Sequence, residues 1–220
     1  MGGRGASQIM QARSFGKHMD VTGFYEPYNI REAEQWHFDK GSFEWQKWNA
    51  LPAEQRDAIE GYTGIHYTAM NSVLFGKRAP SDMVQRLIDN ANAGMKNMRA
   101  TSDFVVWRGE YPEETVRMLG GSPAQVSDAK FLSSTIGKEV VFKGFMSSAI
   151  TESYAWAHKG VVVKIKVPTE TPGFYVDPVS ANMGEKEFLF MSGTRLKVHH
   201  ITRGKNGVIS KLELEVIKEK

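Results

Sequence analysis

The hydrophobic pattern of the chain predicts an α+β fold, in which helices come first and strands follow. Apolar residues recur at helical spacing between residues 30 and 100. From residue 104 onward, short apolar or alternating runs are separated by Gly, Pro, Ser or Asn, as strands are. Strands do not alternate with long helices, and nothing repeats at a fixed period, so neither a βαβ protein nor a solenoid is expected.

Helices are expected throughout the first half of the chain. Two short ones are predicted at residues 31–40 and 42–49, and Pro52, which suits a first turn, should open a helix that ends near residue 60. Helical spacing continues over residues 65–75. Ser81 is the expected N-cap of a further helix, because its hydroxyl can accept a bond from a first-turn N–H. The apolar residues of that helix are Val84, Leu87, Ile88, Ala91, Met95 and Met98.

Seven strands are expected in the second half. Residues 211–217 alternate strictly between apolar and charged side chains, which indicates one buried and one wet face. Other runs are wholly apolar and are expected to be buried on both faces. We therefore expect two packed, mostly antiparallel sheets around a cleft, with the helices of residues 30–100 against one side. The expected strands are residues 104–107, 144–149, 161–167, 174–176, 187–191, 194–201 and 211–217.

The 220 residues fit one domain with an appendage. Residues 1–20 are Gly-rich and basic without periodicity, and are expected to be a flexible lead. No apolar stretch follows their positive charges, so no signal peptide is expected in this chain. Residues 21–220 are expected to form a single domain, helical over about 30–100 and strand-rich over about 104–217.

The composition excludes several classes of site and partner. The chain has no cysteine, which excludes a disulfide scaffold, a thiolate metal site and a cysteine nucleophile. Its six histidines are scattered and no HExxH motif occurs, so no metal is expected. A net charge of +3 gives little support to nucleic-acid binding. No run of about 18 apolar residues is present, so no contact with a membrane is expected.

The strand predicted at residues 104–107 runs into an arginine, Arg108, which Gly109 follows. A guanidinium at the end of a buried strand is costly unless its N–H groups find a partner. A bidentate anion such as a phosphate fits this planar group. An internal salt bridge would satisfy it equally well, so Arg108 alone leaves both interpretations open.

Two pairs of polar residues stand in strand-like sequence. Ser147 and Ser148 are neighbours in an apolar run, so they point to opposite faces and only one can serve a given site. Glu185 and Glu187 should project from one face, with Lys186 on the other. Adjacent carboxylates repel, so one tends to hold a raised pKa suited to acid–base chemistry. Taken singly, each pair is better explained without a functional site: the serines as hydrogen-bonded core residues, and the glutamates as a solvated strand end.

In this order, the three segments are far more specific than any one of them alone. Arg108 at a strand end, then Phe145-Met146-Ser147-Ser148, then Glu185-Lys186-Glu187 entering a strand resembles the mono-ADP-ribosyltransferase exoenzymes of the Arg–Ser–Glu class, which are bacterial toxin and phage enzymes. The likeness covers roughly residues 60–217. The run from Glu187 to Val198 resembles the family's ending.

Two further features bear on this resemblance. Tyr62, Tyr67 and Asn71 resemble the aromatic and Asn positions of the family's helix before the Arg strand. Ala149 stands where the family usually has a third hydroxyl, a departure that affects only a secondary structural bond. Residues 1–50 match no pattern that we can name.

The resemblance implies the family's fold and a reaction without metal, in which NAD is the co-substrate. The nicotinamide–ribose bond breaks, and ADP-ribose moves to a protein side chain through a cation-like transition state. Glu187 would stabilise that cation and bond a ribose hydroxyl, Ser147 would orient Glu187, and Arg108 would hold the pyrophosphate or its ribose. The backbone of Gly109 would contact the nicotinamide carboxamide.

Aromatic contacts to NAD are implied as well. Tyr62 and Tyr67 are expected to line the NAD site. Tyr154 or Trp156, near the start of a helix expected after the serines, would stack on nicotinamide, and Trp156 is the residue we assign. Tyr175 is a further candidate for an aromatic contact.

The resemblance gives Glu185 a separate role. Glu-x-Glu resembles the arginine-modifying members of the family, so Glu185 would orient the acceptor guanidinium and accept its proton. The loop from Asp177 to Gly184 would recognise the target protein of a host cell.

The expected role is a toxin, effector or phage-delivered enzyme with NAD glycohydrolase side activity. It would be secreted or virion-delivered and act in a host cytoplasm. The alternative is a non-catalytic module of the same fold, used as a virion or toxin part, in which the basic residues 4–17 hold nucleic acid or a partner.

Overall fold

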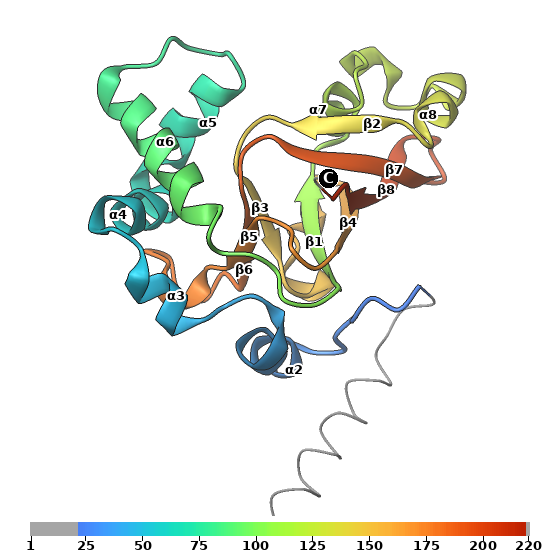
Figure 1. Cartoon of the computed structure of the whole chain (residues 1–220). Helices are drawn as coiled ribbons and strands as arrows, with labels where there is room; N and C mark the ends of the chain where they lie inside the picture. Colours follow the sequence, from blue (N-terminus) through green and yellow to red (C-terminus); the bar gives the residue numbers. More distant parts are fainter. Residues whose placement is uncertain (1–21, 219–220) are drawn as a thin grey trace, which may run out of the picture.

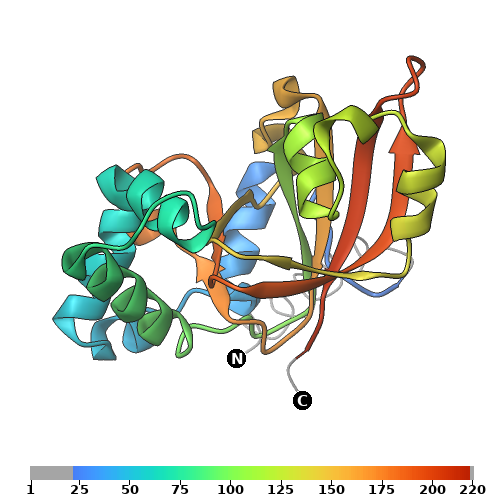
Figure 2. The ribbon, with the colours of Figure 1, turned by 90° about the horizontal axis from the view of Figure 1, so that it is seen from above.

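The computed structural model describes residues 22–218, and the helices of the first half lie beside the strands of the second (Figure 1). The predicted α+β class is confirmed, as is the order of helices before strands. Seen from above, α4, α5 and α6 gather at one end of the molecule and the long strands at the other (Figure 2). The flexible lead predicted for residues 1–20 lies outside the described residues.

The helical part consists of short helices interrupted by two π-helical turns. Ser81 caps α6 as predicted, since its hydroxyl accepts a hydrogen bond of 3.3 Å from the N–H of Val84. The expected helix over 31–40 is regular only to Trp36 and ends in a π-helical turn. The elements are α2 (Ile30–Trp36), η2 (His37–Gly41), α3 (Trp45–Ala50), α4 (Ala53–Gly61), η3 (Tyr62–His66), α5 (Tyr67–Leu74) and α6 (Asp82–Met95).

Within the described residues, eight strands follow the spatial order β2-β7-β8-β4-β1-β3-β6-β5. All neighbouring strands are antiparallel except β4 and β8, which are parallel, so the mostly antiparallel character is confirmed. The strands are β1 (Phe104–Glu110), β2 (Glu139–Phe142), β3 (Met146–Ala149), β4 (Val161–Val167), β5 (Gly173–Tyr175), β6 (Glu187–Phe190), β7 (Thr194–Arg203) and β8 (Ile209–Val216).

Two sheets were expected, whereas the strands are hydrogen-bonded into one. The connection between its two parts is narrow, because β1 pairs with β4 along its whole length but with β3 only at Trp107 and Ala149. β3 pairs along its whole length with β6 instead. The two expected groups of strands therefore exist, and a single residue pair joins them.

The sequence pattern did not predict two helices and one strand of the second half, namely α7 (Pro112–Met118), α8 (Ala129–Thr135) and β2. Seven residues give too few turns for a clear helical period. Val116 of α7 and Leu132 of α8 belong to the core, so these helices contribute to covering the buried face of the sheet. Among the described residues, no helix has the length and apolar character needed to cross a membrane.

Along β8 the other face of the sheet is wet, as the alternation in residues 211–217 predicted. Every second residue of β8 is buried, namely Leu212, Leu214 and Val216. On the opposite face a row of alternating charges crosses four strands, because Lys166 pairs with Glu215, Glu215 with Lys197, and Lys197 with Glu139. Opposite charges side by side suit a solvated surface.

An aromatic cluster fixes the helical part on the sheet. His37 stacks on Tyr175 of β5 at 5.3 Å and meets Phe104 of β1 edge-on. Burial lowers the pKa of His37 to about 3, so this ring is neutral and acts as a core residue. Ser42 completes the contact, since its hydroxyl accepts the N–H of Tyr175 at 2.8 Å and lies 3.3 Å from Nδ1 of His37.

Candidate active site

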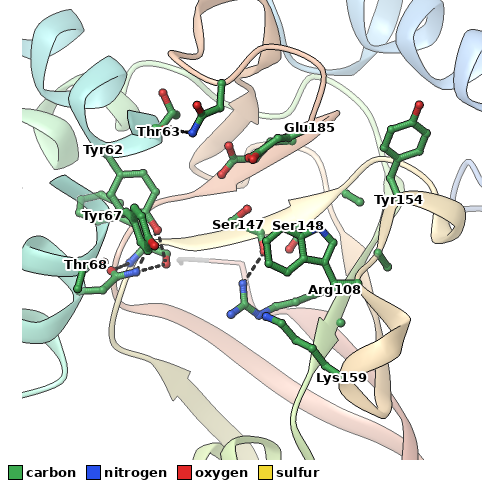
Figure 3. Close-up of a pocket in the computed structure, with 18 of the residues that line it drawn as sticks. Tyr62, Thr63, Tyr67, Thr68, Arg108, Ser147, Ser148, Tyr154, Lys159 and Glu185 are labelled. Carbon is green, nitrogen blue, oxygen red and sulfur yellow. Dashed lines mark hydrogen bonds between the residues drawn. The ribbon is translucent and has the colours of Figure 1, made fainter. Parts of the chain in front are cut away.

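A cavity of about 620 Å³ lies where β1 and β3 part after their single pair (Figure 3). Its walls come from η3 and α5, from β1 and β3, from the segment after β3, and from the turn before β6. The residues that we assigned to catalysis or to NAD binding line this cavity, whereas Tyr175, a further candidate, does not. The assigned residues are Tyr62, Tyr67, Arg108, Gly109, Ser147, Trp156, Glu185 and Glu187.

Arg108 projects from the end of β1 and is held on two sides. Its Nε and Nη2 donate to Oε2 of Glu110 at 3.0 and 2.8 Å, and its Nη1 donates to the carbonyl of Ser147 at 2.7 Å. The internal salt bridge left open by the sequence is thus present. Within the described contacts, these bonds use three of the five N–H groups of a guanidinium, so one on each terminal nitrogen remains for a ligand.

Gly109 is required by a close approach of the chain to β1. A Cβ atom at this position would lie 2.0 Å from the carbonyl oxygen of Trp156, far inside van der Waals contact. The segment after β3 is therefore laid directly on β1. A helix was expected there, but the segment forms two 3₁₀ turns, Glu152–Tyr154 and Ala157–Lys159, the second ended by Gly160 at φ 104°.

Glu187 is a buried carboxyl at the start of β6. It pairs with Ala149, so Ser147 lies diagonally across from it on the same face of the sheet. Glu187 is only 4% exposed, and desolvation raises its pKa from the ordinary 4.5 to about 7. A hydrogen bond from the Ser147 side chain acts against this rise, because it favours the ionised carboxyl.

Glu185 and Glu187 face the same cavity, although not through the predicted strand geometry. β6 begins at Glu187, and Lys186 has a left-handed backbone conformation with φ 56°, so the alternation of a strand stops before Glu185. Partial desolvation and Asp177 raise the pKa of Glu185. After desolvation, Glu185 and Asp177 also raise the pKa of Glu187, whereas Arg108 lowers it, so the two glutamates are electrostatically coupled.

The turn between β5 and β6 is tied to the helical part by Thr63 of η3. The hydroxyl of Thr63 accepts the N–H of Ala181 at 2.9 Å, and its carbonyl accepts Nδ2 of Asn182 at 2.8 Å. The turn and η3 therefore form one continuous wall on this side of the cavity.

A second tie joins the helical part to β3. Asn71 of α5 binds both backbone polar groups of Phe145: its Oδ1 accepts the N–H at 2.9 Å and its Nδ2 donates to the carbonyl at 3.3 Å. The hydroxyl of Tyr62 donates to the same carbonyl at 3.1 Å. Tyr62 is thus buried and engaged, and it fixes the chain two residues before Ser147.

The remaining predicted aromatic residues differ in their placement. Tyr67 and Tyr154 are partly exposed and line the cavity (Figure 3). Trp156 is likewise partly exposed and also lines it. Tyr175 does not line it, because its ring is buried in the core and its hydroxyl points to Glu34 at 3.1 Å. Its suggested aromatic contact with a ligand is therefore wrong.

Lys159 is a cavity residue that sequence reasoning missed. Its ammonium lies 4.9 Å from the ring centre of Trp156 and 5.6 Å from that of Tyr111. Desolvation lowers its pKa, Glu110 opposes this and Arg108 adds to it. Lys159 ends a 3₁₀ turn of three residues, which is too short to give a hydrophobic pattern that would have pointed to this residue. Glu110, in contrast, could have been found from its position two residues after Arg108 on a strand.

Comparison with known families matches most of the chain to one of them. The model described as ADP-ribosyltransferase exoenzyme matches residues 33–219. The chain belongs to this family. The resemblance read from the sequence is therefore confirmed at the level of the family.

Individual relatives agree with this assignment. The chain is 22% identical over 194 residues to a protein named mono-ADP-ribosyltransferase C3 of a Clostridium botulinum D phage, covering 81% of this chain and 72% of the relative. It is 29% identical over 150 residues to the NAD(+)–arginine ADP-ribosyltransferase EFV of Enterococcus faecalis, covering 65% of this chain but only 28% of the relative.

Solved structures share the fold. An ADP-ribosyltransferase of Clostridium botulinum superposes with a TM-score of 0.74 at 18% identity, covering 89% of this chain and 99% of that one. A protein of S. aureus that was solved with NAD gives a TM-score of 0.72 at 16% identity, with 89% and 99% covered. The predicted fold is therefore confirmed. Among the described residues, no three His, Asp or Glu side chains are grouped as metal ligands would be.

Removing the Ser147 hydroxyl should raise the pKa of Glu187 further, because its hydrogen bond favours the ionised carboxyl. NMR titration of labelled glutamate gives the midpoint, with the Glu187 signal identified by its loss in Glu187→Gln. We expect Ser147→Ala to move the midpoint upward by about half a unit or more. Ser148→Ala is the matched control, because the buried Ser148 hydroxyl has no hydrogen-bond partner in the described part of the chain. Equal shifts in both variants would contradict this account.

Replacing Glu187 by Gln should stabilise the fold at alkaline pH. A carboxyl whose pKa rises from 4.5 to about 7 on folding destabilises the native state as the pH rises through that window, and fully above it. The gain for Glu187→Gln should approach about 3 kcal/mol at pH near 8 and vanish near pH 4.5. Urea unfolding at the two pH values measures it. Glu185→Gln, at an exposed position, should gain less, and a gain independent of pH would be inconsistent with burial of an ionised carboxylate.

Proposed function

We propose that this protein cleaves NAD and transfers ADP-ribose to an arginine side chain of a target protein. The observation that carries the proposal is the buried Glu187 in one cavity with Ser147 and Arg108, at the place where two groups of strands part. Membership of the exoenzyme family supports ADP-ribosyl transfer. The S. aureus neighbour solved with NAD supports NAD as the co-substrate.

In the proposed reaction, the bond between the nicotinamide nitrogen and the ribose breaks, and neutral nicotinamide leaves. The ribose carbon then carries positive charge in an oxocarbenium-like transition state. An ionised Glu187 stabilises that charge more strongly than water would, because the site is largely shielded from solvent. Ser147 supports this role by its hydrogen bond to the carboxylate.

Binding of NAD is assigned to other residues that line the same cavity. The two N–H groups left on Arg108 can grip phosphate or ribose oxygens, and their direction is already set by Glu110 and the Ser147 carbonyl. Lys159 supplies a second positive charge beside the same space. Trp156 and Tyr67 offer ring faces to the nicotinamide and to the rest of the ligand, and Tyr62 lines the same cavity.

Transfer to arginine is assigned to Glu185. A protonated guanidinium is a poor nucleophile, and a carboxylate can orient it and accept its proton as the new C–N bond forms. Glu185 suits this task because it is exposed at the cavity while Glu187 is buried. The relative from Enterococcus faecalis, named as acting on arginine, supports this acceptor.

Residues 21–220 are proposed to be one catalytic domain that reaches a host cell as a secreted or phage-delivered toxin, with the turn from Asp177 to Gly184 meeting the target protein. The phage origin of a relative supports such delivery. The alternative is a non-catalytic module of the same fold. It would leave the coupled carboxylates without a purpose, and absence of nicotinamide release would favour it.

The two glutamates should differ in their effect on the two reactions. Glu187→Gln should reduce both NAD hydrolysis and arginine modification by about 100-fold or more, because both pass through the same cation. Glu185→Gln should lose mainly modification, since water needs less help than a protonated guanidinium. Nicotinamide release and label transfer to an arginine-containing acceptor measure the two rates.

Two outcomes would contradict this division. Equally deep loss of both activities in Glu185→Gln would mean that the glutamates act as one unit. Retained transfer in both variants would mean that the reacting centre lies elsewhere. Glu139→Gln is the control, because it replaces an exposed glutamate outside the cavity, and it should change neither rate.

Arg108→Lys should weaken NAD binding at least about tenfold, because a point charge cannot reproduce two parallel N–H donors. It should also loosen the contact to the Ser147 carbonyl. Calorimetry with NAD measures the affinity. Arg117→Lys is the matched control, as Arg117 forms an exposed ion pair with Glu114 outside the cavity. Unchanged affinity in Arg108→Lys would make Arg108 purely structural.

A further inference from the structure

Lys186, the residue between the two glutamates, has an unusual backbone. Its φ of 56° lies in the left-handed region, which lysine rarely occupies and which glycine or asparagine would fill with less strain. β6 begins only after this residue, and Glu185 and Glu187 on either side of it both line the cavity. Contacts of Lys186 with its surroundings must therefore stabilise this strained backbone conformation.

The backbone and the side chain of Lys186 are both anchored. Its N–H donates to Oδ1 of Asp177 at 2.8 Å, and its carbonyl accepts the N–H of Ile150 at 3.0 Å. Its ammonium donates to Oε1 of Glu34 at 2.7 Å and to Oδ2 of Asp177 at 3.2 Å. The side chain therefore points into the junction with α2.

Asp177 is the buried partner in this junction. It is 6% exposed, and besides the two contacts from Lys186 it accepts the N–H of Gly184 at 3.0 Å and the hydroxyl of Tyr175 at 3.4 Å. Its negative charge lies close enough to raise the pKa of both Glu185 and Glu187. The ammonium of Lys186 is thus the neutralising partner of a charge that acts on the proposed site.

We propose that Lys186 is a positioning residue: anchored to Glu34 of the helical part, it holds Glu185 and Glu187 toward one cavity and neutralises Asp177 behind them. The proposal deepens the proposed function and rests on it for its kinetic consequences. It assigns the middle residue of Glu-x-Glu to the protein interior, with no contact to NAD or to the acceptor.

The charges around Glu187 determine in which direction its pKa should move when Lys186 is replaced. Removing the ammonium leaves Asp177 uncompensated, which favours the protonated forms of both glutamates and should move their titration upward. The charged and titratable groups that face Glu187, Glu185 or Asp177 are Glu34 from α2, Tyr62 from η3, Arg108 from β1, Tyr175 from β5 and Lys186 itself.

Two substitutions separate the backbone from the charge. Lys186→Gly suits the left-handed conformation but has no ammonium, and Lys186→Met keeps the aliphatic side chain without the charge. In both, the midpoint of the Glu187 NMR titration should rise by about half a pH unit. Nicotinamide release near pH 7 should fall about twofold and recover as the pH is raised to about 9, which a merely damaged structure would not do. Lys186→Arg should keep the wild-type midpoint.

If either Lys186 variant fails to fold, Glu34→Gln tests the anchor in its place. It removes the partner on α2, so kcat should fall several-fold while KM for NAD changes little. Glu26→Gln is the matched control, because Glu26 pairs with Lys164 at 2.6 Å with 34% exposure, close to the 32% of Glu34, but outside the cavity. It should change neither the midpoint nor kcat.

Three results would overturn the proposal. Lys186→Gly with wild-type rate and midpoint would show that only the turn geometry matters. A midpoint unmoved in both neutral variants would show that the ammonium does not act on Glu187. Equal effects of Glu34→Gln and Glu26→Gln would show that the anchor is not specific. The NMR midpoint needs no catalysis, so it decides the proposal even if the wild-type protein releases no nicotinamide, a result that would refute only the proposed function.

Discussion

A carboxyl group buried at the junction of two groups of strands is the constraint on which the rest of the site depends. Desolvation raises the pKa of Glu187 to about 7, so its ionised form is costly in the folded protein. The same desolvation makes that ionised form a strong partner for a nearby cation. The hydrogen bond from Ser147 and the charge of Arg108 favour ionisation, and both come from strands that meet β6 directly or through β3.

The helical part shapes this site although it contributes few of the groups proposed to react. Asn71 and Tyr62 hold Phe145, and with it the position of Ser147 on β3. Thr63 holds the turn before β6. Glu34 reaches the same turn through Lys186. Each of these contacts spans a large separation in sequence, so the cavity walls are set by packing of the helices on the sheet.

The sequence was most informative where the type and the order of residues point to one site, as for Arg108, Ser147 and Glu187, which the structure brings into one cavity. It failed where the backbone leaves a regular period. The left-handed Lys186 is invisible to a period-two argument, and the short helices α7 and α8 give too few turns to detect. Lys159 and the single pair of Trp107 with Ala149 depend on tertiary contacts, which no local pattern encodes.

The account is tested most directly by the pH dependence of nicotinamide release from NAD by the unmodified protein. Because kcat/KM reports ionisations of the free enzyme, it should rise with pH through a single midpoint near 7 and then level off, as Glu187 becomes ionised. A kcat/KM that is constant between about pH 5 and 9, or that falls as the pH rises through this midpoint, would contradict the claim that an ionised, buried Glu187 drives the reaction.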